Sequence, residues 1–313
     1  MSTEITTAFK KQYSDSFELT YQQTQSILGG TVRREDQSSE MMFFDYLGEA
    51  DVEWDGPRHG ATPQIDTPHS RRRNTLHVAR WADKIDKPDK VKTLKDPQSG
   101  YIKVGTAAIR RGEDERILEG LGATAYTGQD GGTAVTLVDE SYRIMGDGTV
   151  KAPGVADAGT TETGLTPQKI AQIGAIFDDN SVPEMDRHIV CNSNQKWYLL
   201  GSTKTTSADY SGVRSLAHGE INTWMGFTFH WLPSARFAVN TTDTGCYNCY
   251  AYHRSAVMLG VGFDLNTEVD RLPTNNYSVQ VFAEMMMGST RLQGLGVVGI
   301  LLKKDPGIDF TLA

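Results

Sequence analysis

The sequence has few of the features that mark secreted, membrane or nucleic-acid-binding proteins. It holds only three cysteines in 313 residues, which favours a reducing compartment over a disulfide framework. Its longest apolar run, residues 295–302, is far too short to span a bilayer, and residues 1–11 lack the apolar stretch of a signal peptide. The formal net charge of −8 argues against a dedicated nucleic-acid binder. We therefore expect a soluble protein made in the cytoplasm, with no membrane partner.

Motifs for catalysis are also scarce. The chain has no G-x-S-x-G elbow and no P-loop. Residues 294–299 read G-x-G-x-x-G, but the residues that follow are strand-like, whereas a dinucleotide fingerprint opens a helix. We expect these glycines to lie in a twisted terminal strand. The sequence thus predicts no catalytic residue, no cofactor and no enzymatic activity.

The cysteines and histidines do not form a recognisable metal site. Cys246 and Cys249 make one C-x-x-C pair, and Cys191 alone does not complete the second pair that structural zinc requires. We expect them to be small buried side chains. His59 and His69 flank an arginine-rich segment without H-E-x-x-H spacing, so we predict loop polar groups and no metal. A soluble hydrolase that uses these two histidines is the alternative from a different functional class.

The N-terminal region, by contrast, carries a regular apolar pattern. Large side chains recur every four residues and the positions between them are polar, which predicts a helix with one apolar ridge that ends at Gly29 and Gly30. A single amphipathic helix is not stable alone in water, so the ridge must be buried, either on a neighbouring subunit or on the chain's own core. The ridge residues are Ile5, Phe9, Tyr13, Phe17 and Tyr21.

A second unusual region follows the ridge. Residues 41–47 predict an apolar strand, residues 54–73 a long polar loop, and residues 76–81 a returning strand that pairs with the first as a hairpin. The arginines of the loop allow three interpretations: a solvated turn, a nucleic-acid patch, or ion pairs with carboxylates of an adjacent subunit, a role that suits the planar guanidinium. They are Arg58, Arg71, Arg72 and Arg73.

The remaining two thirds of the chain predict a mixed α+β protein. One helix begins at Asp96 and Pro97 and continues through Leu121, and another begins at Thr166 and Pro167 and reaches Val182. Residues 247–255 fit a short helix or a strand equally well. The other segments read as strands: residues 31–34, 133–144, 188–191, 197–200, 223–231, 256–263, 277–287 and 297–302.

Five groups of residues, in this order along the chain, are similar to segments of a known protein family. They are residues 9–13; 43–48; 58–63 with 71–73; 82–86 with 96–97; and 288–291 with 296–300. Together they resemble the major capsid proteins of tailed bacteriophages, which have the Hong Kong 97-type coat fold. The resemblance implies an N-terminal arm (1–38), an extended loop hairpin (39–86), a peripheral domain with a long spine helix (87–160), an axial domain (161–245) and return strands of both domains (246–313).

The same resemblance implies self-assembly. Pentamers and hexamers of the chain would form an icosahedral virion capsid around phage double-stranded DNA, contacted without sequence specificity, after synthesis in the host bacterial cytoplasm. A separate scaffolding protein and a portal would be partners, with a cement protein as a further candidate. An encapsulin-like bacterial compartment shell is the alternative. The predicted subunit interface consists of Phe9, Tyr13, Phe17, Tyr21, Arg58, Arg71, Arg72 and Arg73.

Overall fold

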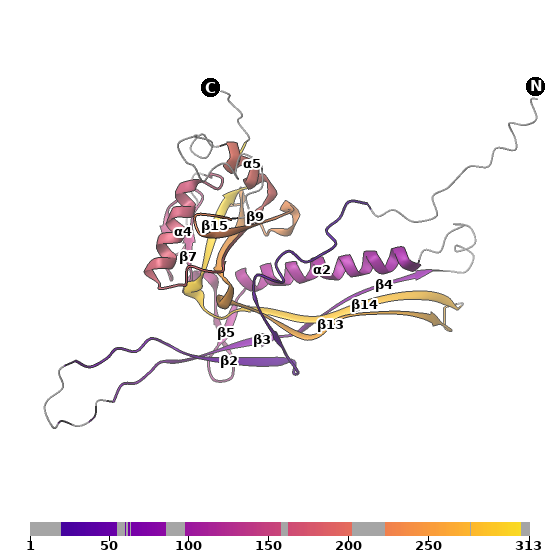
Figure 1. The fold of residues 1–313 in the computed structure, drawn as a ribbon, viewed down its shortest axis with the longest axis horizontal. Helices are drawn as coiled ribbons and strands as arrows, with labels where there is room; N and C mark the ends of the chain where they lie inside the picture. The colour runs from indigo at the N-terminus through magenta and orange to yellow at the C-terminus, as the bar shows by residue number, and fades with distance from the viewer. Residues whose placement is uncertain are drawn as a thin grey trace, which may run out of the picture. The chain divides into compact units, whose positions relative to one another are not determined.

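The computed structural model describes residues 20–54, 60, 62, 64–85, 98–157, 162–201, 223–275 and 277–307 (Figure 1). Most of the predicted apolar ridge, including Phe9, Tyr13 and Phe17, lies outside these residues, as does Arg58. The α-helices are α2 (Gln98–Gly122), α3 (Leu137–Glu140), α4 (Pro167–Asp179) and α5 (Ser193–Gly201), and the 3-10 helices are η3 (Ser234–Arg236), η4 (Arg254–Ala256) and η5 (Gly294–Gly296).

Within the described part of the chain, the strands form one seven-stranded and two four-stranded sheets. Their orders are β10-β11-β9-β12-β15-β7-β8, β1-β13-β14-β4 and β2-β3-β5-β6. The strands are β1 (Arg33–Asp36), β2 (Met41–Leu47), β3 (His69–Thr75), β4 (His77–Ile85), β5 (Ala125–Thr127), β6 (Thr133–Val135), β7 (Tyr142–Ile144), β8 (Val150–Lys151), β9 (Arg187–Asn192), β10 (Thr223–Trp224), β11 (Phe227–Leu232), β12 (Cys246–His253), β13 (Val257–Leu272), β14 (Ser278–Arg291) and β15 (Val297–Lys303).

The chain divides into two compact units. The first contains residues 1–26, 78–112 and 263–285, and the second contains residues 27–77, 113–262 and 286–313. In the first unit, Arg111 donates to the side-chain oxygen of Gln22 at 2.9 Å, and the space beside Gly105 is filled by the ring of Trp81. Glycine is required at 105, because a Cβ atom there would overlap that ring.

The core of the second unit lies on the seven-stranded sheet. Strands β9, β12 and β15 are buried over most of their length, and α4 packs on the sheet through Phe177, whose ring centroid lies 5.9 Å from that of Phe227. Thr166 caps α4 by accepting a hydrogen bond from the backbone N–H of Lys169 at 3.3 Å, and Pro167 follows as the first helical residue. The helix begins where we predicted but ends earlier, at Asp179.

The predicted hairpin exists, but its second strand is not the predicted one. Strand β2 pairs antiparallel with β3, so that Met41 lies opposite Thr75 and Leu47 opposite His69. The arginines of residues 71–73 therefore lie on a strand and not in a loop. The segment that we expected to pair, residues 76–81, enters β4, which belongs to another sheet.

The predicted N-terminal helix does not extend through residues 20–30, which form turns and irregular backbone. A side chain satisfies backbone donors here in place of helical hydrogen bonds. The Asp114 carboxylate on α2 accepts from the N–H groups of Ile27 at 3.1 Å and Leu28 at 2.9 Å. Leu28 is fully buried, whereas Tyr21 is fully exposed.

Three predicted strands were wrong in whole or in part. Residues 197–200 belong to helix α5, because an apolar run alone does not distinguish a helix from a strand. Residues 133–144 are interrupted by α3, whose first turn is held by a hydrogen bond from the Thr136 N–H to the Asp139 carboxylate at 2.8 Å. Residues 223–231 contain a turn at Met225 and Gly226, both with positive φ, as a tight hairpin requires.

The structure also decides the conformation of residues 247–255, which the sequence left open, and of the G-x-G-x-x-G sequence at residues 294–299. Residues 247–255 form most of strand β12 followed by the 3-10 helix η4. The G-x-G-x-x-G sequence forms the 3-10 turn η5 and the start of strand β15, so a strand follows where a dinucleotide site would need a helix. None of the helices in the described part of the chain has the length and apolar character of a membrane span.

Candidate assembly interface

Three consecutive arginines on β3 have different environments. Successive side chains on a strand point to opposite faces, so Arg72 lies on one face and Arg71 and Arg73 on the other. Arg71 is partly exposed and binds Asp45 on β2 with two hydrogen bonds, Nε to Oδ1 at 2.5 Å and Nη2 to Oδ2 at 2.9 Å. The hydrogen bond from Arg71 lowers the pKa of the Asp45 carboxyl group. This pair joins the two strands of the hairpin across their exposed face.

Arg72 is buried and shares one carboxylate with a second arginine. It forms an ion pair with Glu140 of α3, and its Nε donates to the carbonyl oxygen of Leu292 at 3.2 Å. Arg291, at the end of β14, is fully buried and donates from Nε to the other oxygen of Glu140 at 2.6 Å. We call Arg72, Glu140 and Arg291 the hairpin clamp.

The hairpin clamp joins three segments that are distant in sequence. Arg291 also donates to the carbonyl oxygens of Leu121 at 2.6 Å and Ala123 at 3.0 Å, where α2 ends. Burial lowers the pKa of Arg291, and the charge of Glu140 opposes that shift. A buried charge without a counter-charge is very costly, so both arginines require Glu140. Through them, Glu140 links β3 at the root of the hairpin to β14 and to the end of α2.

Arg73 differs from both neighbours. Its guanidinium carbon lies 4.4 Å from the ring centroid of Tyr126 on β5, a cation–π contact. Its Nε is buried without a hydrogen-bond partner, and among the residues described here Arg73 forms no ion pair. Two of the three arginines thus find their carboxylates within the chain, and the third does not.

Around the end of the hairpin, where the Gly48 N–H donates to the Pro68 carbonyl at 2.7 Å, the chain exposes apolar side chains. Leu47 is 64% exposed, Val52 65% and Trp54 81%. We call residues 47–54 the outer segment. Exposed apolar side chains that follow one another along the chain are typical of interaction surfaces.

One buried charged group of the second unit, the ammonium of Lys169, is satisfied by carbonyl oxygens of the chain. Lys169 on α4 is 1% exposed, and its Nζ donates to the carbonyl oxygens of Gly146 at 2.9 Å, Leu301 at 3.2 Å and Thr163 at 3.3 Å. Burial lowers the pKa of Lys169 to about 8. The amine therefore connects α4 to β15 and to two loops.

A pair of histidines lies on neighbouring strands of the same sheet. His188 Nδ1 on β9 and His230 Nε2 on β11 are 3.2 Å apart, so one nitrogen donates to the other. Burial, followed by the proximity of His230, lowers the pKa of His188 to about 4, and burial also lowers the pKa of His230. The pair is therefore neutral at pH 7.

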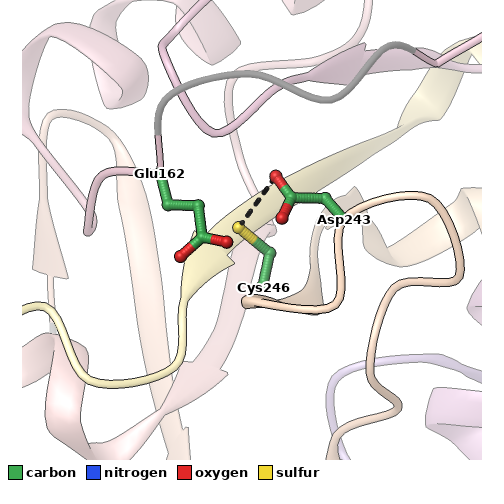
Figure 2. Close-up of side chains that lie close together, drawn as sticks. All are labelled: Glu162, Asp243 and Cys246. Carbon is green, nitrogen blue, oxygen red and sulfur yellow. Dashed lines mark hydrogen bonds between the residues drawn. The ribbon is translucent and has the colours of Figure 1, made fainter.

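Glu162, Asp243 and Cys246 bring their ligand-type atoms within 4.8 Å of one another (Figure 2). Cys246 Sγ donates to Asp243 Oδ2 at 3.6 Å, and burial raises the pKa of this thiol to about 12. A hydrogen bond with Asp243 raises the pKa of the Glu162 carboxyl group. We interpret the three groups as a hydrogen-bonded cluster that joins residue 162 to the turn before β12.

Sequence reasoning missed the residues that hold these sites together. No local sequence pattern identifies Glu140, because its partners Arg72 and Arg291 are 68 and 151 residues away in the chain. Lys169 did give a signal: it shares a face of the predicted helix with the buried Ile173 and Ile176, where a lysine is unusual. The prediction that Cys191, Cys246 and Cys249 are buried is confirmed.

Comparison with known proteins identifies the family of this chain. A family model described as phage capsid protein matches residues 5–304, nearly the whole chain. The chain belongs to this phage capsid protein family. The predicted major capsid protein with an α+β, Hong Kong 97-like fold is thereby confirmed, and its role is to form a shell. No curated protein matches the chain in sequence.

Solved capsid structures share the fold of this family member at low sequence identity. The capsid of cyanophage P-SCSP1u matches with a TM-score of 0.70 at 16% identity, covering 96% of this chain and 95% of that one. An acid-stable capsid of Helicobacter pylori bacteriophage KHP30 gives 0.71 at 10%, covering 97% and 98%. Mycobacterium phage Che8 gives 0.65 at 17%, covering 93% and 96%. The interface roles of individual residues stay predictions.

Proposed function

We propose that this capsid protein builds an icosahedral shell from pentamers and hexamers and that the shell encloses double-stranded phage DNA. The match of the phage capsid family over residues 5–304 carries this proposal. The exposed apolar outer segment supports it, because a subunit that leaves Leu47, Val52 and Trp54 uncovered is completed by a neighbour. Each contact can be weak, since every subunit makes many contacts at once.

We further infer that assembly uses two regions of each subunit. The N-terminal arm would place Phe9, Tyr13, Phe17 and Tyr21 against a neighbour, and the hairpin of β2 and β3 would lie across an adjacent subunit. Fully burying one such aromatic side chain contributes about 1.5–3 kcal/mol as an upper value. The fully exposed side chain of Tyr21 agrees with this role.

The partners follow from the same proposal. A separate scaffolding protein would guide assembly, a portal would occupy one vertex, and a cement protein would be an additional external partner. The net charge of −8 suits a wall that faces packaged DNA without binding it tightly. The protein would be synthesised in the cytoplasm of the host bacterium and would act in the virion capsid as a structural component without catalytic activity.

The two alternatives are less well supported. A compartment shell protein would share the fold, but the family that matches the chain is one of phage capsid proteins. A hydrolase would need a site around His59 and His69; the first lies outside the described residues and the second is an exposed residue at the start of β3. Replacing both histidines with alanine should leave assembly unchanged.

The test is the state of the purified chain. Light scattering after size-exclusion chromatography and negative-stain microscopy should show closed particles or five- and six-membered rings, alone or after co-expression with a scaffolding protein. A chain that remains a monodisperse monomer in both conditions at high concentration would contradict the proposal.

A further inference from the structure

A polar cavity of about 480 Å³ lies beside Arg73 at the root of the hairpin. Its wall includes Arg116 and Glu119 of α2, Tyr126 of β5, and Thr290 of β14. This volume falls in the range of about 300–1,000 Å³ that ligand pockets occupy, so it can receive one or two side chains.

The cavity has an excess of positive charge. Arg116 is already paired with Glu119, Nη1 to Oε2 at 2.5 Å. The guanidinium of Arg73 lies over the face of Tyr126, its Nε has no hydrogen-bond partner, and it forms no ion pair with a described residue. Two other polar atoms of the cavity lining, Asn74 Oδ1 and Ser289 Oγ, also lack partners among the described residues. The wall therefore offers one uncompensated guanidinium in polar surroundings, which suits a carboxylate.

The outer segment carries three carboxylates that form no ion pair with any described residue. Glu49, Asp51 and Glu53 are all exposed, and they alternate with the exposed apolar residues Val52 and Trp54. In an extended chain, such alternation places acids on one face and apolar side chains on the other. One strip can thus form ion pairs and cover apolar surface at the same time.

These carboxylates cannot reach the cavity of their own subunit. Arg73 lies opposite Phe43, and the hairpin continues away from this pair to Leu47 and His69. Glu49 comes six residues after Phe43, which at 3.3 Å per residue places it about 20 Å further along the hairpin. Among the described residues, Glu119 is the carboxylate that lines the cavity, and it is already paired with Arg116. A second copy of this chain can present the acids of its outer segment to Arg73.

We propose that a carboxylate of residues 49–53 in one subunit enters the cavity of a neighbouring subunit and pairs with Arg73. This pairing rests on the proposed function, because it requires subunits that lie side by side in a shell. Of the three arginines on β3, it assigns the predicted interface role to Arg73, while Arg71 and Arg72 serve the hairpin of their own chain; the prediction for Arg58 is unchanged. Such a pair fixes register more than it adds affinity.

A charge-exchange experiment tests the pairing by the yield of particles. Arg73→Glu alone, and Glu49→Lys, Asp51→Lys and Glu53→Lys together, should each lower the yield at least tenfold. The combined variant should return the yield to within about threefold of the wild type. A normal yield for Arg73→Glu, or a combined variant no better than its parents, would overturn the proposal.

Two further variants keep the test decisive. Arg80→Glu changes an exposed arginine that pairs with Glu284 and does not line the cavity, so its yield should stay normal; an equal loss would mean that only net charge matters. Arg73→Gln replaces Arg73→Glu if the latter fails to fold. If Arg73→Gln lowers the yield and the three lysines do not, another anion such as inorganic phosphate fills the cavity, and the proposal is wrong.

A crosslink supplies a direct readout. With Arg73→Cys and Asp51→Cys in one chain, oxidised particles should yield disulfide-linked multimers on a non-reducing gel, whereas either single variant should not. Only monomers from intact particles would contradict the pairing. Wild-type chains that form no particles would instead contradict the proposed function, so the two failures are distinguishable.

Discussion

The interior of the second unit and the outer segment treat their side chains in opposite ways. In the interior, even charged groups are completed by the same chain: Glu140 binds two buried arginines, and Lys169 donates to three carbonyl oxygens. In the outer segment, Leu47, Val52 and Trp54 remain uncovered. The chain thus pairs its buried charged side chains internally but leaves large apolar side chains exposed. We expect such a subunit to fold alone and to bury the outer segment only in an assembly.

The difference separates stability from assembly. Substitutions in the interior should lower the free energy of unfolding of the isolated subunit. Substitutions in the outer segment should leave that free energy unchanged and affect only the formation of particles. The following predictions test this separation, beginning with the largest expected loss of subunit stability.

Glu140→Gln should have the largest effect. It leaves the buried side chains of Arg72 and Arg291 without a counter-charge, and breaking a buried ion pair in this way costs about 3–5 kcal/mol. Urea unfolding at pH 7 measures the loss. The control is Glu119→Gln, whose side chain is 61% exposed and whose pair should be worth less than about 1 kcal/mol. Similar small losses in both variants would mean that the hairpin clamp is not a major source of stability.

Lys169→Met should cost less, about 1–3 kcal/mol at pH 7, because three carbonyl oxygens lose their donor. The loss should also depend on pH. The folded pKa of Lys169 is about 8 against 10.5 for the ordinary side chain, so the unfolded chain holds more protons between these values. Wild-type stability should therefore rise relative to the variant as pH increases from 8 to 10.5. A difference that is constant across this window would contradict the buried position of the amine.

His188→Gln should change the response to acid. The folded pKa of His188 is about 4 against 6.5 for the ordinary side chain, so the unfolded chain binds more protons between pH 6.5 and pH 4. The wild type should lose stability as pH falls through this window, and the variant should lose less. Thermal unfolding at pH 7, 5.5 and 4.5 is the measurement. Parallel losses in both proteins would place the acid sensitivity at other groups.

Trp54→Ser should have the smallest effect on the subunit, within about 0.5 kcal/mol, because the side chain is 81% exposed. It should nevertheless lower the yield of particles. Phe177→Ala provides the contrast: that side chain is fully buried against the sheet, and its loss should cost about 3–5 kcal/mol. If Trp54→Ser destabilised the subunit comparably, the outer segment would be part of the subunit's own core.

Local patterns in the sequence predicted several elements well. Strand β2 was predicted at its observed bounds, and α4 was predicted from Thr166 and Pro167, because caps and short apolar runs act locally. The apolar run at residues 197–200 was predicted to be a strand, but it lies in helix α5. The four-residue period before Gly29 also misled within the described residues, where Asp114 provides the hydrogen bonds that a helix would have made.

The candidate interface was only partly predictable for a similar reason. The sequence identified the cluster of Arg71, Arg72 and Arg73 but not their different environments. Those depend on Asp45 across the hairpin, on Glu140 from a one-turn helix, and on Tyr126 from β5. Such partners are chosen by the tertiary fold, and no spacing in the sequence encodes them.

The most direct test of this account is hydrogen–deuterium exchange measured on the same chain as dissociated subunits and as assembled particles. We predict that residues 48–54 exchange rapidly in subunits and become protected in particles, while β3 and the segment around Glu140 exchange at the same slow rate in both. Equal exchange of residues 48–54 in the two states would contradict the claim that a neighbouring subunit covers the outer segment.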